Sequence, residues 1–479
     1  MKNFKRIIAC VMCIAMIVSL ASCKKNNNAS NGETVTLTWL VPGDKQPDLA
    51  SVLDEANKIV EENIGAKIDL QFIDAGAFTE KMTMNMASGL DFDLCFTGWV
   101  NPYVQAVQKG GLMDITDMID NYPDLKAAIP EYAWDVAKID GRIYAVPNLQ
   151  IMAVATSLVI FKDIADKYDF DFSKVKTIDD IEPYLEMVKN GEPGIFPYRT
   201  NYGITPWYAD KYEELTSNLV ILKDGSSSKV SLLRDTEEFK HAVETLHDWY
   251  NKGYIRPDVL SASDDNTDYM AGKYAVSHTM LKPGVEAELK AQTGRDVIVV
   301  PLADPYLTKD KGTATMIGIG QNSKNPEKAL EFIQLINTND ELYNLISFGI
   351  EGKHYTKNEE GKVVFIDNSG YAPKAAWKFG NQFKALITDG QDDDVWEKTE
   401  AVNNEAVKSP LLGFVFDNTN VKSEISQVET VLSEYGVLNS GAKDPSGLLD
   451  GYNSKLDTAG QRKIAEEMQK QIDAYWETK

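Results

Sequence analysis

The stretch that decides the fold runs from residue 35 to residue 97. It contains three apolar segments, VTLTWLV at 35–41, KIDLQFI at 67–73 and FDLCFT at 92–97. Each segment has the length and apolar pattern of a β-strand. The segments between them, 47–63 and 78–88, are expected to be helices, and the first has a continuous apolar face. Strands that alternate with helices predict a parallel sheet covered by helices.

The rest of the chain continues this alternation. Asp140-Gly141 separates two short apolar segments and predicts a two-residue hairpin, and Pro147-Asn148 marks a boundary between two halves. Beyond it we expect a β-rich run at 152–161, a helix at 235–252, strands at 273–280 and 296–301, a helix at 326–337, a largely helical chain from Ala375 onward, and a last amphipathic helix at 459–476.

The first residues predict export. Lys2, Lys5 and Arg6 precede an apolar run at 7–20 that has the length of a signal-peptide core and is too short for a transmembrane helix. The run ends in Leu20-Ala21-Ser22-Cys23, which resembles the lipobox of bacterial lipoproteins. That resemblance implies a signal peptide at 1–22 and a lipid on Cys23. The polar residues that follow, up to residue 33, should form a flexible tether.

Composition limits the classes of function. The formal charge is −23 and the predicted leader holds only positive charges, so the mature chain is strongly acidic and should repel nucleic acid. Of the four cysteines, Cys10 and Cys13 leave with the leader and Cys23 is the expected anchor. Cys95 alone remains, so no internal disulfide is expected, and its apolar neighbours predict a small core residue.

Several short motifs resemble those of the extracellular solute-binding proteins of ABC importers, in the family's order and spacing. They are Asp91-Phe92-Asp93-Leu94 with Trp99, the run from Gln108 to Thr116 that ends in Leu112-Met113-Asp114-Ile115-Thr116, Gly141-Arg142-Ile143-Tyr144-Ala145-Val146-Pro147, Tyr269 to Val276, and Asn325 to Phe332. Two later stretches, 343–355 and 377–383, resemble the LipO-type oligosaccharide-binding lipoproteins, whose distinctive C-terminal domain would cover 413–479.

The resemblance implies an α/β fold, two-lobed and periplasmic-binding-protein-like (type II), with hinge crossings and a mostly helical C-terminal extension. Lobe 1 would comprise 34–146 with about 311–373, lobe 2 would comprise 147–310 with about 374–412, and the C-terminal domain would pack on lobe 2. Lobe closure around an oligosaccharide would create the form that the permease recognises. We expect a lipid-anchored, monomeric receptor on the outer face of the cell membrane, without a cofactor.

Sugar rings offer apolar faces to Trp and Tyr and hydroxyls to carboxylates, amides and Lys. We therefore sought such side chains on loops that leave strands, where ligands of α/β folds bind. Trp99 is the strongest candidate, while Trp39 is equally well explained as a core residue. The candidate ligand-binding residues are Trp39, Asp44, Lys45, Thr97, Trp99, Asn101, Tyr103, Gln150, Trp207, Tyr208, His278, Lys282, Trp377 and Asn381, with Met152 and Gln382 beside them.

Other functions are less well supported. Motifs of zinc proteases, serine hydrolases and nucleotide-binding proteins are absent from the sequence, and His241 and His247 lie on different faces of one predicted helix. The acidic clusters at 264–268 and 392–394 could bind calcium but lack EF-hand spacing, and helix starts or solvated loops explain them better. A receptor for a peptide or another solute, a surface glycoside hydrolase and a purely structural lipoprotein remain as alternatives.

Overall fold

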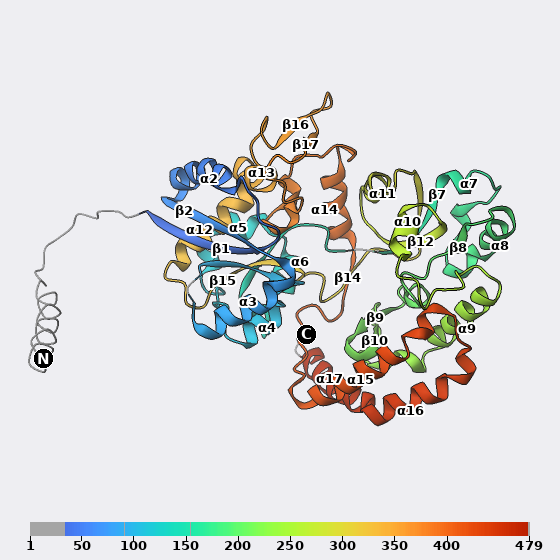
Figure 1. Cartoon of the computed structure of the whole chain (residues 1–479). Coiled ribbons are helices and arrows are strands. Elements are labelled where there is room, and N and C mark those ends of the chain that lie inside the picture. Colours follow the sequence, from blue (N-terminus) through green and yellow to red (C-terminus); the bar gives the residue numbers. More distant parts are fainter. Residues whose placement is uncertain (1–33, 91, 154, 478–479) are drawn as a thin grey trace, which may run out of the picture. The chain divides into compact units, whose positions relative to one another are not determined.

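The computed structural model describes residues 34–90, 92–153 and 155–477, so the predicted leader and Cys23 lie outside the described residues. Lobe 1 is built on a five-stranded sheet of order β2-β1-β3-β15-β6 (Figure 1). Its strands are β1 (Val35–Pro42), β2 (Ala66–Ile73), β3 (Leu94–Gly98), β6 (Ala145–Pro147) and β15 (Thr315–Ile319). Strands β1 and β3 are parallel, as predicted, whereas β15 runs antiparallel to both β3 and β6. The sheet is therefore mixed, because β15 returns from lobe 2.

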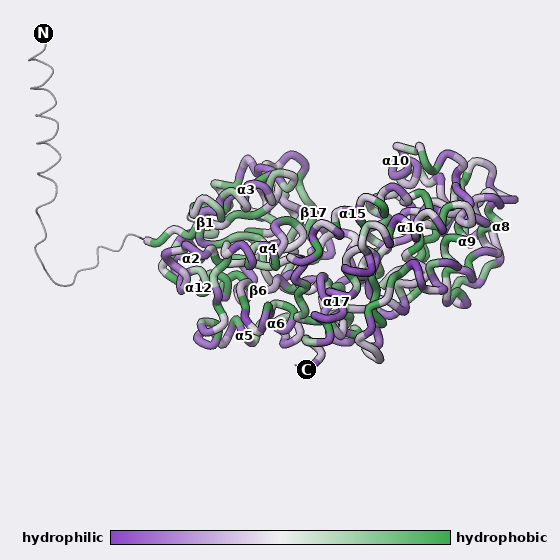
Figure 2. The backbone as a smooth tube through the Cα atoms, turned by 90° about the horizontal axis from the view of Figure 1, so that it is seen from below, coloured by the Kyte–Doolittle hydropathy of each residue, from purple (hydrophilic) through white to green (hydrophobic). Residues whose placement is uncertain are grey.

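Helices cover both faces of this sheet. They are α2 (Leu49–Ile64), α3 (Ala75–Ser88), α4 (Tyr103–Gln108), α5 (Pro123–Ala128), α6 (Glu131–Ala137), α12 (Pro326–Thr338) and α13 (Asp340–Phe348). Figures 1 and 2 both place α3 and α12 on opposite sides of β1. Helices α2 and α3 each end at a glycine with a left-handed backbone, Gly65 and Gly89, which is the usual way to stop a helix.

Two details of lobe 1 confirm local predictions. The hairpin of β4 (Lys138–Ile139) and β5 (Arg142–Ile143) turns at Asp140 and Gly141, both with positive φ, as a tight two-residue turn requires. Cys95 is fully buried in β3, and burial raises the pKa of its thiol, so it acts as a small core residue.

Lobe 2 contains a four-stranded sheet of order β13-β7-β12-β8 and a smaller sheet of order β11-β10-β9. The larger sheet is formed by β7 (Ala155–Phe161), β8 (Phe196–Tyr198), β12 (Tyr274–Leu281) and β13 (Val297–Pro301), and the smaller one by β9 (Tyr212–Leu215), β10 (Leu219–Leu222) and β11 (Ser231–Leu232). The helices are α7 (Lys162–Ala165), α8 (Glu182–Gly191), α9 (Glu237–Asn251), α10 (Asp265–Met270) and α11 (Val285–Thr293). Helix α9 presents the apolar face predicted for it, with Phe239, Leu246 and Trp249 buried.

The three C-terminal helices share one hydrophobic core with lobe 2. They are α15 (Lys422–Glu434), α16 (Leu449–Ala459) and α17 (Gln461–Trp476). Hydrophilic and hydrophobic residues alternate along α16 and α17 (Figure 2). Tyr452 stacks on Phe239 of α9 at 5.8 Å. The side chain of Arg234 donates to Gln461 and to Asp457, so a buried cation is paired at the contact.

The segment after residue 373 departs from the helical prediction. Residues 374–394 are mainly irregular, with short 3₁₀ turns at Ala376–Lys378 and Gln382–Lys384, and regular helix resumes only at α14 (Val395–Glu405). Asn344 of α13 donates to the carbonyl of Lys384, and Lys384 pairs with Asp340. The hairpin of β16 (Tyr355–Lys357) and β17 (Val363–Phe365) lies beside the same segment, through a bridge between Val363 and Thr388. These contacts tie the segment to α13 and β17.

Helix α14 holds the first crossing between the lobes. The fully buried Asn403 accepts from the backbone N–H groups of Met152 and Ala153, and donates to the carbonyl of Gln150 at 2.6 Å. A last pair of short strands, β14 (Tyr306–Leu307) and β18 (Val407–Lys408), ties the second crossing to the end of α14. Because one asparagine satisfies three backbone groups, it fixes the path of the crossing.

Arginine and lysine side chains pair with the acidic clusters at 264–268 and 392–394. Arg256 contacts Asp258, Asp264 and Asp268, while Arg199 pairs with Asp265 at the start of α10. Lys398 pairs with Asp392 and Asp394, and Val395 after them begins α14. Both clusters are thus helix starts. Among residues 34–477 that the structure describes, no group of three or more His, Cys, Asp or Glu residues could hold a metal ion, and no helix is long and apolar enough to cross a membrane.

Candidate ligand-binding site

Two tryptophans meet where β3 ends. Trp99 follows the last residue of β3 and keeps 56% of its surface exposed, which is unusual for so large an apolar side chain. Its ring centroid lies 6.4 Å from that of the half-buried Trp377, with the planes tilted by 59°. Phe96 supports Trp377 from β3 at 6.3 Å. The pair presents an exposed aromatic surface at the carboxyl end of a parallel strand.

The loop that carries Trp99 is fixed by its neighbours. Gly98 has φ +152° and passes so close to Ala314 that a Cβ atom there would lie 1.9 Å from the Ala314 carbonyl oxygen. The Trp99 N–H donates to that same oxygen at 2.9 Å. The Thr97 hydroxyl donates to the Asn101 carbonyl, and the Asn101 side chain donates to the Phe96 carbonyl. Thr97 and Asn101 were predicted to face a ligand, but both are buried and their side chains bond within the loop.

Lys378, which the sequence did not single out, lies beneath Trp377. Its ammonium donates to the Pro42 carbonyl at 2.7 Å and is 5.6 Å from the ring centroid of Trp377. Burial lowers the pKa of Lys378 to about 8, although the charge of the exposed Asp44 opposes the shift. The Lys378 carbonyl accepts from Asn148 of the crossing. One residue thus joins the aromatic surface to the end of β1 and to the crossing.

A hollow of about 330 Å³ opens beside Trp377. It gathers the predicted residues Gln150, Lys282 and Trp377, together with Gln382 and Trp396. The Gln150 amide donates to the Thr315 hydroxyl at 2.6 Å, and Lys282 pairs with Glu288 at 2.6 Å. Three segments far apart in sequence therefore bring amide, ammonium and indole groups together, a combination that suits a neutral polar ligand with apolar ring faces.

A second aromatic surface lies in lobe 2. The half-buried Tyr202 stacks on His278, with centroids 5.6 Å apart and planes 18° from parallel. The Tyr198 hydroxyl lies 2.7 Å from His278 Nε2, and Asn201 binds both backbone groups of His278. Burial lowers the pKa of His278 to about 3, so the ring is neutral. His278 is thus buried, and Tyr202 is the more accessible of the two rings, although the sequence singled out His278.

Several predicted contact residues are packing residues. Trp39 is fully buried between Phe332 and Phe379, and Trp207 packs on Trp249 while its indole N–H donates to Asp179. The Tyr103 hydroxyl donates to the Ala137 carbonyl, and the Tyr208 hydroxyl donates to the Glu214 carboxylate.

Two further predicted residues are buried as well. Asn381 caps the turn at Phe383, and Met152 lies in the core. Asp44 and Lys45 are exposed just beyond β1. Of the aromatic predictions, Trp99 and Trp377 alone remain accessible, while Tyr202 was missed in the loop that also holds Trp207.

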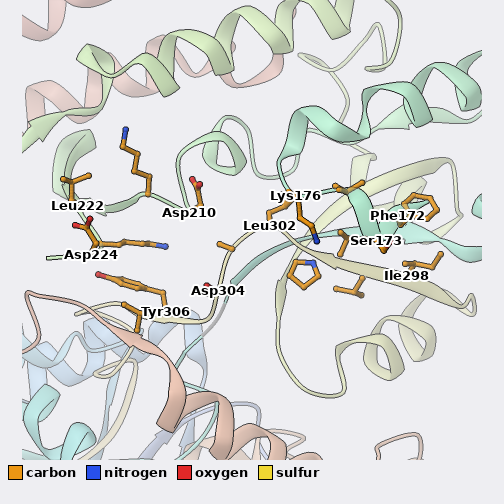
Figure 3. Close-up of a pocket in the computed structure, with 18 residues that line it drawn as sticks. Phe172, Ser173, Lys176, Asp210, Leu222, Asp224, Ile298, Leu302, Asp304 and Tyr306 are labelled. Carbon is orange, nitrogen blue, oxygen red and sulfur yellow. The ribbon is translucent and has the colours of Figure 1, made fainter. Parts of the chain in front are cut away.

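A larger hollow of about 1110 Å³ follows β13, the edge strand of its sheet (Figure 3). Tyr306, Leu222 and Asp224 lie at one end of it, and Phe172 and Ser173 lie at the other. The ammonium of Lys223 covers the Tyr306 ring at 4.4 Å, and the Tyr306 hydroxyl donates to the buried Glu213. None of the described residues that line this hollow is a tryptophan, so it offers less to a sugar ring than the surface at Trp377.

Comparisons with known proteins agree with this arrangement. Residues 46–342 match the family described as bacterial extracellular solute-binding protein, and residues 410–477 match a domain of unknown function (DUF3502). A carbohydrate ABC transporter substrate-binding protein of Streptococcus pneumoniae serotype 4 is 30% identical over 497 residues, which cover both chains completely.

Solved structures extend the comparison. The crystal structure of the N-glycan transport solute binding protein NgtS from Streptococcus pneumoniae has a TM-score of 0.81 and 28% identity, covering 93% of this chain and 99% of that one. The complex of NgtS with Man5GlcNAc has a TM-score of 0.68 and 30% identity at the same coverage.

The fold and the site thus define a two-lobed binding protein. The chain belongs to the bacterial extracellular solute-binding protein family.

Proposed function

We propose that this protein captures an oligosaccharide and delivers it to the permease of an ABC importer. The observation that carries the proposal is the exposed pair Trp99 and Trp377, which adjoins a hollow lined by Gln150, Lys282 and Gln382. Indole rings bind the apolar faces of sugars, and amide and ammonium groups bind their hydroxyls. A peptide receptor would need partners for charged termini, and the Lys282 ammonium in the hollow is already paired with Glu288.

The relatives support a carbohydrate ligand. The full-length relative from Streptococcus pneumoniae is named for carbohydrate transport, and NgtS is named for N-glycan transport. One of the NgtS structures is a complex with the oligosaccharide Man5GlcNAc, and this also supports a carbohydrate ligand here.

The remaining features of the proposal come from the sequence. A signal peptide that ends at the lipobox-like Leu20-Ala21-Ser22-Cys23 would place a lipid on Cys23 and anchor a monomeric protein at the outer face of the membrane. We also propose that the protein binds its ligand without cleaving it. Mass spectrometry of the mature protein purified from its native membrane would detect the lipid as added mass on Cys23.

Calorimetric titration of the mature protein with a panel of oligosaccharides tests the function. We expect one class of oligosaccharide to bind and to raise the melting temperature. The variant Trp377→Ala should weaken binding about thirtyfold. Trp476→Ala on α17, a half-buried tryptophan outside the hollow, should bind as the wild type does. Absence of binding across the panel would refute the proposal, and cleavage products after incubation would show a hydrolase.

A further inference from the structure

One ion pair sets the charge of the hollow beside Trp377. Among the described residues that line this hollow, Lys282 is the only cation, while Glu288 and Asp389 carry carboxylates. The Lys282 ammonium lies 2.6 Å from a carboxylate oxygen of Glu288. The single positive charge is therefore already matched before a ligand arrives, and Asp389 leaves the hollow with an excess of negative charge.

The fold fixes Glu288 beside Lys282. Lys282 directly follows β12, and a turn at Gly284 then begins α11, so the two charged side chains come from consecutive elements. On α11, Val285 and Leu289 are buried and pack against β7 and β13. Glu288 lies in the first turn of this helix, where the helix dipole favours a negative charge.

The second carboxylate of the hollow is also held in place. The Asp389 N–H donates to the Val363 carbonyl at 2.9 Å, and the Asp389 carboxylate accepts from the Asn358 amide at 2.9 Å. Thr388 beside it donates twice to the Gln391 side chain at 2.8 Å, which fixes the turn. Because the Asn358 amide is uncharged, this contact leaves the negative charge of Asp389 uncompensated.

The ion pair can be reached by a ligand, since the side chains of Lys282 and Glu288 are 36% and 47% exposed. An ammonium has three N–H donors, so a sugar hydroxyl can accept from Lys282 while Glu288 keeps its own contact. A sugar carboxylate would either lie near two negative groups or displace Glu288 from Lys282. Both arrangements place like charges together or leave a carboxylate without its partner, so both weaken binding.

We propose that Glu288 is a specificity-determining residue. By holding the Lys282 ammonium, it makes the hollow select neutral oligosaccharides over oligosaccharides that carry carboxylates. This inference rests on the proposed function and assigns the limit on its substrate class to one side chain. Without the Glu288 charge, the Lys282 ammonium becomes available to a sugar carboxylate.

The test compares a neutral glycan with its own oxidised form. The probes are Man5GlcNAc, the glycan in one NgtS structure, and Man5GlcNAc whose primary hydroxyl groups are oxidised to carboxylates. At pH 7 we expect wild type to bind the oxidised glycan at least about thirtyfold more weakly. Glu288→Gln keeps the size of the side chain and removes its charge. It should narrow this ratio at least about tenfold and leave the affinity for Man5GlcNAc within about threefold of wild type, which also reports an intact fold.

Two further variants identify the contact. Glu286→Gln removes the same charge from the same turn of α11 outside the hollow, so it should leave the ratio within about twofold of wild type. The double variant Lys282→Met with Glu288→Gln lacks the ammonium. It should lose most of the affinity for the oxidised glycan that Glu288→Gln gains. Calorimetric titration measures all of these affinities.

Each other outcome decides the question. Equal affinity of wild type for the two glycan forms, or the same ratio in Glu288→Gln as in wild type, would overturn the role of Glu288. An equal change in Glu286→Gln would assign the effect to overall charge and would also overturn it. Retention of the gained affinity in the double variant would show that Lys282 is not the partner.

The wider panel separates this inference from the proposed function. If Man5GlcNAc does not bind, the neutral and oxidised pair is prepared from the panel oligosaccharide that does. Binding of oligogalacturonate together with no binding of any neutral oligosaccharide would overturn the selection and leave the proposed function standing. No binding of any oligosaccharide would overturn the proposed function itself.

Discussion

Two aromatic clusters of this protein use the same residue types for opposite purposes. In lobe 2, Trp249 contacts Tyr198 at 4.9 Å and Trp207 at 5.6 Å, and all three are buried. In lobe 1, Trp99 and Trp377 lie 6.4 Å apart with accessible ring surface. The first cluster stabilises the fold and the second is available to a ligand. Aromatic content alone therefore does not distinguish the two clusters, and the proposed site rests on exposure at the end of a strand.

The largest effect should come from the buried cluster. Trp249→Ala removes a fully buried ring and should lower the free energy of unfolding by about 3–5 kcal/mol, through lost apolar contact and the cavity left behind. Urea denaturation measures the change. Trp249→Phe leaves a smaller cavity and removes an indole N–H that has no hydrogen-bond partner among the described residues, so it should cost clearly less. Equal stability of Trp249→Ala and wild type would contradict the claim that the buried cluster stabilises the fold.

The opposite pattern is expected at Trp377. Trp377→Ala should weaken oligosaccharide binding by about 2 kcal/mol, as central aromatic contacts commonly do, with a smaller effect on the unfolding midpoint than Trp249→Ala. Calorimetry and thermal denaturation of the same sample separate the two quantities. A variant that loses stability but keeps its affinity would show that Trp377 is a packing residue.

The buried His278 should make the free energy of unfolding depend on pH. Its folded pKa of about 3 lies below the usual value of 6.5, so the unfolded chain binds more protons between these values and stability falls as pH decreases from 6.5. The contribution is about 1.4 kcal/mol per pH unit. His278→Gln should therefore show a shallower loss of unfolding free energy between pH 7 and pH 5. Parallel pH profiles for the variant and wild type would contradict the burial argument.

The smallest effect is expected at Trp99. Its ring is more exposed than that of Trp377 and has fewer protein contacts to position it, so Trp99→Ala should cost about 1 kcal/mol of binding and almost no stability. Titration of this variant beside Trp377→Ala ranks the two rings. A larger loss at Trp99 would make it the primary contact.

Much of the fold follows from sequence patterns. Strands β1, β2 and β3, the hairpin at Asp140-Gly141 and the amphipathic helices α9 and α12 lie where periodicity predicts them. Strand β15 was not predicted, because its pairing with β3 and β6 depends on the chain returning from lobe 2. The irregular segment 374–394 was also missed, since its structure comes from tertiary bonds to α13 and β17 and not from local preference.

The site was less predictable because burial is a tertiary property. Tyr202 and Trp207 belong to one turn-rich loop, and the packing of Trp249 decides which of them is accessible. Lys378 resembles any surface lysine in the sequence, yet it becomes buried where the end of β1 meets the returning segment. Trp99 was predictable because its position directly after β3 is itself a sequence feature.

The most direct measurement is a crystal structure of the mature protein with an oligosaccharide that binds in the panel. We predict a sugar ring stacked on Trp377, with hydroxyl groups bonded to the Gln382 carboxamide. Density for the oligosaccharide in the hollow along β13, with Trp99 and Trp377 free, would contradict the assignment of the site.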